Sequence, residues 1–265
     1  MEFLKVVKRR SFLNELSYVA LNIGLAIAIL ASIKVTNSVF PAFALVLLSK
    51  WRVLAVRSRF WAANIQANLV SVIVDFSFII FLYNSNMYGA NDAKNLIFQG
   101  ILVVFYVLWL LLLKPQSKRI FVISQAGLAL FFGVVAIYAT AFDWIATPVV
   151  LLMWLVGYAT ARHVLSSYDE DNMLFLSLAW GLAVAELGWL AYHWSIAYKL
   201  PIVTNLMIPQ ISIIILCIGF VVCKSYDSFF HHQKIRLSDI ILPLLFTISI
   251  VGVLLLAFNG VSTNI

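Results

Sequence analysis

The long uninterrupted runs of apolar residues constrain the fold of this chain more than any other feature. Each extends over about 18 to 23 residues, the length at which an α-helix crosses the hydrocarbon core of a bilayer. Transmembrane β-strands would instead show about 10 residues of alternating apolar and polar character. With 63% hydrophobic and 11% charged residues, the 265-residue chain also has too little polar surface for a water-soluble globule. The sequence therefore predicts an all-α, polytopic transmembrane helical bundle.

Nine such spans can be placed along the chain. They cover residues 16–34, 37–55, 62–83, 95–113, 120–142, 145–162, 173–194, 201–223 and 239–259. The second span has the shortest apolar core, VFPAFALVLL, so Lys50 and Arg52 would have to extend their side chains to the headgroups. No Gly/Ser-rich linker or low-complexity tract separates a second domain, and we expect residues 1–265 to form a single integral membrane domain.

Residues 1–15 precede the first span and mix apolar side chains with four cations. This composition is typical of a helix lying in the inner membrane interface, and a frayed basic tail is the alternative. The apolar run that follows is longer than the core of a secretory signal, and it ends at Lys34 without a small-residue cleavage site. We therefore interpret it as an uncleaved first span.

The 18 Lys and Arg residues test the order of the spans independently of hydropathy. If the N-terminus is cytoplasmic, only Lys34, Lys94 and Lys199 fall in outer segments, and the other fifteen fall inside. This distribution obeys the positive-inside rule and predicts a multi-pass protein of the cytoplasmic (inner) membrane, with the N-terminus inside and the C-terminus outside. Because the cations are spread over five cytoplasmic edges, the net charge of +7 favours contact with the lipid bilayer and its anionic lipid over nucleic-acid binding.

Four polar residues interrupt the third span at helical spacing. Asn64, Asn68, Ser71 and Asp75 stand at i, i+4, i+7 and i+11, which places them within an arc of about 60° on a helix. A polar stripe facing lipid would leave these groups without hydrogen-bond partners, so we expect it to face the interior of the bundle.

A second polar group is expected where the seventh and eighth spans form a hairpin. Glu186 lies in the seventh span, and His193 follows on the same face. The eighth span contains Asn205, Pro209 and Gln210, and the hairpin would place Pro209 and Gln210 opposite Glu186. Pro209 would break that helix and free the carbonyl of Asn205, which would then need another donor.

Neither Asp75 nor Glu186 has a Lys or Arg at its depth in the predicted spans, about 20 Å from the inner edge. An ionised carboxylate without a cation costs roughly 2.5 to 3.5 kcal/mol at the centre of a membrane helix. The two acids are therefore expected either to be protonated and to hold helices together, or to line a wet cavity that a proton or cation can reach.

Sequence motifs of enzymes are absent from the chain: there is no H-E-x-x-H, G-x-S-x-G or G-x-x-x-x-G-K-[ST]. No catalytic residue, metal ligand or cofactor is predicted, and no protein partner is identified. We expect a small transporter or channel-like protein for a proton, a cation or a small polar solute. The alternative is a non-catalytic membrane scaffold or assembly partner whose buried polar residues lock helix packing. An intramembrane enzyme acting on lipid, with Asp75 and Glu186 as an acid pair, has no positive support in the sequence.

Overall fold

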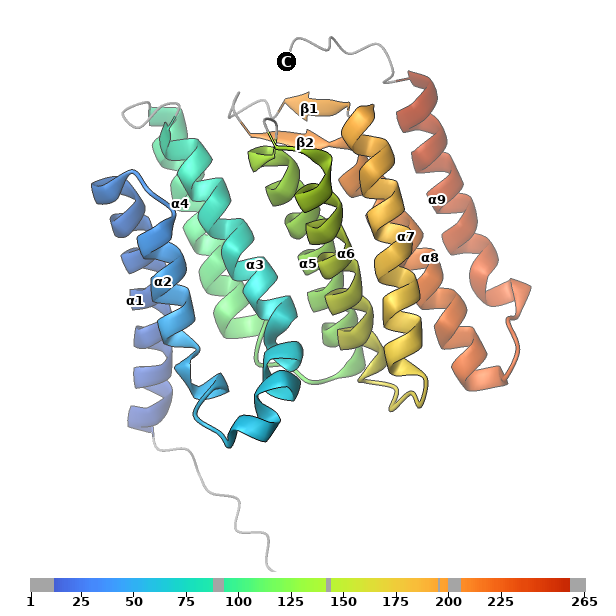
Figure 1. The fold of residues 1–265 in the computed structure, drawn as a ribbon, viewed down its shortest axis with the longest axis horizontal. Helices are drawn as coiled ribbons and strands as arrows, with labels where there is room; N and C mark the ends of the chain where they lie inside the picture. The colour runs from blue at the N-terminus through green and yellow to red at the C-terminus, as the bar shows by residue number, and fades with distance from the viewer. Residues whose placement is uncertain (1–11, 88–92, 142–143, 195, 200–205, 258–265) are drawn as a thin grey trace, which may run out of the picture.

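The computed structural model of the protein describes residues 12–87, 93–141, 144–194, 196–199 and 206–257. In these ranges the chain forms a bundle of long helices (Figure 1). The elements are α1 (Phe12–Thr36), α2 (Phe40–Ser49), η1 (Trp51–Val53), η2 (Ser58–Phe60), α3 (Trp61–Met87), α4 (Ala93–Leu108), η3 (Trp109–Leu113), α5 (Arg119–Thr140), α6 (Ala146–Leu165), α7 (Met173–His193), β1 (Ala197–Lys199), β2 (Met207–Pro209), α8 (Gln210–His232) and α9 (Leu237–Ala257). Eight helices in these ranges are long and apolar enough to cross a membrane, which confirms the predicted all-α helical class.

Seven of the nine predicted spans match a long helix within four residues at each end, so the apolar runs locate most helices well. The interfacial helix predicted for residues 1–15 falls mostly outside the described residues, which begin at Phe12. The start of α1 and the end of α9 lie at opposite ends of the bundle (Figure 1). The second and eighth predicted spans are the two that differ.

The second predicted span, residues 37–55, is helical only in its first part. Asn37 adopts a left-handed conformation with φ of 48° and ends α1, and Pro41 lies in the first turn of α2, where a proline is well tolerated. Helix α2 has 10 residues and covers about 15 Å, half the thickness of the hydrocarbon core. From Lys50 the chain continues through the short turns η1 and η2 to the start of α3 at the other end of the bundle (Figure 1).

The eighth predicted span, residues 201–223, was placed too early in the sequence. Strand β1 pairs with β2 in an antiparallel hairpin, with Ala197 opposite Pro209, and α8 begins only at Gln210. Pro209 therefore precedes α8 as its N-cap and does not break the interior of a helix, which corrects the sequence prediction. The reason is that proline lacks an N–H group and is well accommodated just before or at the first turn.

Two hydrophobic cores share helix α5. The first lies among α1 to α4 and α5, and the second among α5, α6, α7 and α8. The side-chain amide of Asn84 on α3 donates a hydrogen bond of 3.2 Å to the carbonyl of Ala139 on α5, which ties the two parts together. Helix α9 packs against α8 at one edge of the bundle (Figure 1).

Helices α6 and α7 approach each other more closely than ordinary side chains would allow. A Cβ atom added to Gly157 of α6 would lie 2.8 Å from Cβ of Val184 and 3.0 Å from Cα of Gly181, both on α7. Small residues at such a contact let two helix backbones come together, a common way of packing helices in membranes. This tight contact fixes which face of α7 points inward.

Candidate functional site

The carboxylate of Asp75 is paired with a cation at the centre of the bundle. The ammonium of Lys50 lies 2.7 Å from Oδ2 of Asp75, and the exposed fractions of the two side chains are 10% and 2%. Asp75 comes 14 residues after the start of α3, at a height of about 21 Å along this helix. Lys50 reaches the same depth because α2 ends there, half-way through the bundle.

This ion pair corrects the expectation that no Lys or Arg stands at the depth of Asp75. The prediction failed because it extended the second helix to residue 55 and sent the Lys50 side chain out to the headgroups. In the structure Lys50 follows the last turn of α2 and turns inward to α3. The neighbouring cation offsets part of the cost of burying this carboxylate.

Two further side chains complete the surroundings of the pair. Lys50 donates a hydrogen bond of 2.7 Å to the hydroxyl of Ser71, one turn before Asp75 on α3. The indole N–H of Trp109 donates to the other carboxylate oxygen of Asp75 at 3.3 Å. Asp75 is therefore held by the cation that follows α2, by the Trp109 indole of η3 and, at 3.5 Å, by the Ser71 hydroxyl of its own helix.

Trp109 begins a short π-helical segment, η3, at the end of α4. The wider turn is seen in the hydrogen bond from the N–H of Lys114 to the carbonyl of Trp109, and the hydroxyl of Tyr18 on α1 donates to the carbonyl of Leu110. Such segments are uncommon and are often found at functional sites. Here the segment carries the Trp109 side chain that contacts Asp75.

The predicted polar stripe on α3 contacts Lys50, which follows α2, and the segment η1 that comes next. Besides Ser71 and Asp75, the side-chain amide of Asn64 donates at 3.3 Å to the carbonyl of Val53, the last residue of η1. Asn68 donates to the backbone of its own helix, at the carbonyl of Asn64. Asp75 is thus the buried member of the stripe, while Asn64, Asn68 and Ser71 are half-buried, and the two asparagines donate to backbone carbonyls.

Beyond Asp75, toward the end of the bundle where α3 ends and α4 begins, lies a row of buried polar side chains. Tyr106, Gln99 and Asn95 stand on one face of α4 at helical spacing, and Ser85 lies on α3. All four are buried. Both amide atoms of Gln99 and the Ser85 hydroxyl have no hydrogen-bond partner among the described residues, whereas the Tyr106 hydroxyl lies next to the Asp75 carboxylate and interacts with it. Buried polar groups of this kind normally bind water or a ligand.

Glu186 has a different environment from the one predicted. It lies on an exposed face of α7, because the opposite face of the helix, with Gly181 and Gly188, packs against α6. His193 is also exposed, and its ring contacts Trp189 with a centroid distance of 5.0 Å. Glu186 therefore does not meet Asp75, and the structure does not bring the two acids into one cluster.

The predicted partners of Glu186 on the eighth span are also placed elsewhere. Gln210 is the first residue of α8, at the end of the bundle, and its amide donates a hydrogen bond of 2.8 Å to the carbonyl of Leu254 on α9. Pro209 lies in β2, and Asn205 falls outside the described residues. The predicted site of Glu186, Pro209 and Gln210 is therefore wrong, since it relied on a helix that starts nine residues later than expected.

Several residues of this site escaped the sequence analysis. Lys50 could have been found from the shortness of the apolar run before it, since a helix of ten residues cannot carry a side chain across the membrane. The spacing of Gln99 and Tyr106, seven residues apart, is a weak signal of a shared helix face. Nothing in the sequence marks Trp109 as different from the other seven tryptophans.

Comparison of the chain with protein-family models, with curated proteins and with solved structures found no match. The chemistry of the site therefore has to be inferred from its own groups. A carboxylate that accepts from a lysine, near the Gln99 amide that has no hydrogen-bond partner among the described residues, can exchange a proton or bind a small cation or polar solute.

Proposed function

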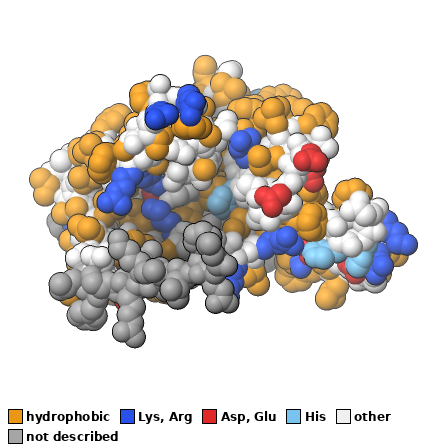
Figure 2. Space-filling view, turned by 90° about the horizontal axis from the view of Figure 1, so that it is seen from below, with side chains coloured by type: hydrophobic (Ala, Val, Ile, Leu, Met, Phe, Trp, Pro, Cys, Tyr) orange, Lys and Arg blue, Asp and Glu red, His pale blue; other side chains and the backbone are white. Residues whose placement is uncertain are grey.

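We propose that the protein is a multi-pass protein of the cytoplasmic membrane that crosses it nine times, with its N-terminus inside. The short helix α2, together with residues 50–60, would make the second crossing. The distribution of cations supports the orientation: Figure 2 views the end of the bundle where α1, α3 and α5 begin, and Lys and Arg side chains are spread over this face. A periplasm-active reporter fused at position 90 and a cytoplasm-active reporter fused at position 117 should both give signal, and the reverse pattern at either position would refute the orientation.

Within this topology we propose a small transporter or channel-like protein that moves a proton, a cation or a small polar solute through the α1–α4 part of the bundle. The observation that carries this proposal is the Lys50–Asp75 pair at the end of a helix that stops half-way through the membrane. Helices interrupted at mid-membrane are a recurrent feature of transporter sites, because their ends present backbone groups to an ion.

The chemistry of such a site follows from competition for one carboxylate. Lys50 is a cation tethered to the chain, and it occupies the position that a transported proton or cation would take on Asp75. When Asp75 gains a proton or a free cation, the attraction that holds the Lys50 ammonium is weakened, and its side chain can move away. Binding of a proton or a cation to Asp75 would in this way be coupled to the position of the Lys50 side chain at the end of α2.

The row of buried polar groups on α4 and α3 would form the outer half of the transport route. From Asp75 it continues through Tyr106 and Gln99 to the level of Asn95, and Tyr106 and Asn95 are about 17 Å apart along α4. The Gln99 amide can both donate and accept, and it has no partner among the described residues. A file of water molecules or a small solute in this position would satisfy these groups.

The test is flux through purified protein in liposomes. Proteoliposomes loaded with a pH-sensitive or cation-sensitive dye should equilibrate a gradient of H⁺, Na⁺ or K⁺ faster than protein-free liposomes. Asp75→Asn should abolish this flux, because the amide cannot bind a proton or a cation at that position, while Glu186→Gln should leave it unchanged. Equal flux through wild type and Asp75→Asn would refute the proposal.

A scaffold is the second candidate, and a specific observation favours it. The Asp75 side chain is almost completely enclosed and its charge is already matched by Lys50, which is the environment of a structural contact between helices. In that case the variant with both charges removed, Lys50→Met with Asp75→Leu, should keep every cellular role of the protein. Loss of that role in a variant that remains folded would favour transport. The acid-pair enzyme has lost its basis, since Asp75 and Glu186 do not meet.

A further inference from the structure

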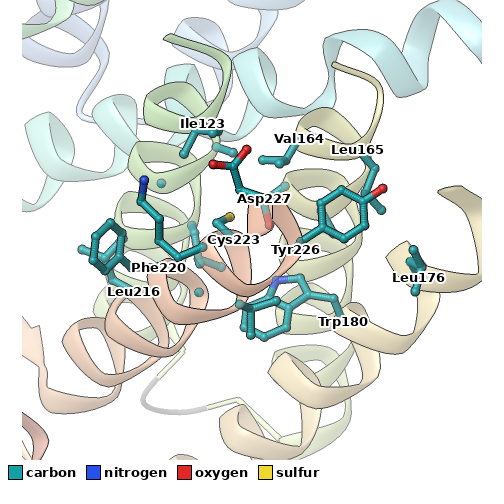
Figure 3. A pocket seen from close by; sticks show the side chains of 18 of the residues that line it. Ile123, Val164, Leu165, Leu176, Trp180, Leu216, Phe220, Cys223, Tyr226 and Asp227 are labelled. Atoms are coloured by element: carbon teal, nitrogen blue, oxygen red, sulfur yellow. The ribbon is translucent and has the colours of Figure 1, made fainter. Parts of the chain in front are cut away.

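The α5–α8 part of the bundle contains a cavity of about 750 Å³ at the end where the cations gather (Figure 3). Its walls are formed almost entirely by apolar side chains, among them Trp180 and Phe220 (Figure 3). Small residues from all four helices leave the space open: Ala126, Gly127, Ala161, Ala179, Ala183 and Gly219. The volume is within the range of about 300 to 1,000 Å³ that is common for ligand sites.

The charged residues of the lining stand at the mouth of this cavity, and Ser124 and Thr160 are neutral polar residues of the lining. Lys224, Tyr226 and Asp227, from the last turns of α8, belong to its lining. Asp227 is already engaged, because it accepts a hydrogen bond of 3.0 Å from the Tyr168 hydroxyl and lies 3.5 Å from Nδ1 of His231. The acidic group at the mouth is thus tied to neighbours in the protein.

The cations at the mouth are not matched in this way. The Arg119 guanidinium lies 4.1 Å from the centre of the Tyr168 ring and 5.2 Å from that of Phe230, so aromatic rings hold it, and Tyr168 in turn contacts Tyr226 of the cavity lining. Among the described residues, neither Arg119 nor Lys224 forms an ion pair with a carboxylate. Two positive charges are therefore available to an anion that sits over the cavity.

We infer that this cavity binds a phospholipid, with an acyl chain among the apolar walls and the phosphate at Lys224 and Arg119. An acyl chain suits a lining that offers almost no hydrogen-bond partner, and a phosphate suits two cations beside tyrosines. Tyr168 and Tyr226 form an aromatic contact at the mouth with a centroid distance of 5.0 Å, and tyrosines are enriched where membranes meet water. This site is separate from the Lys50–Asp75 pair and does not depend on a transport function.

Trp180 in the cavity wall provides a direct readout. In detergent solution, phosphatidylglycerol with brominated acyl chains should quench tryptophan fluorescence in a saturable manner, and the quenched component should disappear in Trp180→Phe. Brominated diacylglycerol, which has the same chains without a phosphate, should need about a tenfold higher concentration, because it lacks the charge-assisted contacts. Equal titration curves for the two lipids would refute the phosphate part of the assignment.

Matched variants separate the two parts of the site. Lys224→Gln should weaken binding of phosphatidylglycerol about tenfold and leave diacylglycerol unchanged, whereas Lys234→Gln, at the same end but outside the cavity lining, should change neither. Ala179→Trp should fill the cavity and abolish quenching by both lipids, and Leu182→Trp, on the exposed side of α7, is its control. Quenching of Trp180 that persists in Ala179→Trp, or an effect of Lys234→Gln equal to that of Lys224→Gln, would overturn the proposal.

Discussion

The two parts of this bundle, α1–α4 and α5–α8, differ in where their charged and polar residues lie. Between α1 and α4 a charge pair is inside: Asp75 is enclosed with Lys50, and Gln99, whose amide has no hydrogen-bond partner among the described residues, is buried farther along α4. Between α5 and α8 the buried polar side chains, such as Gln125 and Thr160, are neutral and hydrogen-bonded to backbone carbonyls, and Glu186 is exposed on α7. The comparison teaches that an acid within an apolar run is buried only where another segment supplies a partner for it.

The largest effect should come from breaking the buried pair. Asp75→Leu leaves the Lys50 ammonium inside without a counter-charge, and we expect a loss of about 3 to 5 kcal/mol in the free energy of unfolding. The double variant Lys50→Met with Asp75→Leu should recover most of this loss, because both charges are gone. The free energies of unfolding of the wild type and of these two variants can be measured in detergent by circular dichroism.

Glu186→Gln is the matched control for this cycle, since it removes a carboxylate from an exposed face of α7, outside the buried pair, and should not lower the free energy of unfolding. A double variant as unstable as Asp75→Leu alone would mean that the two charges do not act as a pair. A large loss in Glu186→Gln would instead contradict the contrast between the two acids.

The α6–α7 contact should be the next most sensitive feature. Gly157→Ala introduces a methyl group 2.8 Å from Cβ of Val184, and overpacking of this kind costs about 1 to 3 kcal/mol. Gly24→Ala in α1 is the control, because a Cβ there meets no atom within 4 Å and should stabilise the helix by about 0.5 to 1 kcal/mol. Thermal unfolding of the two variants should therefore shift in opposite directions, and shifts of the same sign would contradict the close contact.

A smaller effect is expected from the hydroxyl that assists the ion pair. Ser71→Ala removes the acceptor for Lys50 and should destabilise the protein by about 1 to 2 kcal/mol, since hydrogen bonds to charged groups are stronger than neutral ones. Ser77→Ala is the control on the same helix, because the Ser77 hydroxyl donates only to the carbonyl of Ile73 within α3. Equal unfolding midpoints for the two variants would show that Ser71 contributes nothing to the pair.

The smallest effect concerns the loop between α6 and α7, at the mouth of the lipid cavity. The hydroxyl of Tyr226 and the backbone N–H of Asn172 donate to the Glu170 carboxylate, and these bonds hold the pKa of Glu170 below its usual value of 4.5. The stabilisation is therefore present above pH 4.5 and is lost as the pH falls through the lowered pKa. The stability difference between wild type and Tyr226→Phe should shrink on acidification below pH 4.5; a constant difference would contradict this.

The amino-acid sequence by itself determined where most of the helices lie. A run of about 20 apolar residues has to form a helix in a membrane, because no water is present to satisfy its backbone, and this rule holds whatever the neighbours of the run are. Seven predicted spans consequently match the structure within four residues at each end. The apolar run before Lys50 and the proline at position 209 were misjudged, since both were assigned to complete spans: α2 stops at Ser49, and β1 and β2 precede α8.

Only the tertiary structure decided which polar residues belong together. Helical spacing tells which side chains share a face, but it does not tell what that face meets, and the partner of Asp75 comes from a residue 25 positions earlier that the sequence pattern assigned to the membrane surface. Glu186 is exposed for a reason that lies in another helix, because Gly157 on α6 draws the opposite face of α7 inward. The cavity likewise exists only because small residues from α5, α6, α7 and α8 meet at one place. Contacts of this kind depend on the packing of segments distant in sequence, and a single sequence carries no record of that packing.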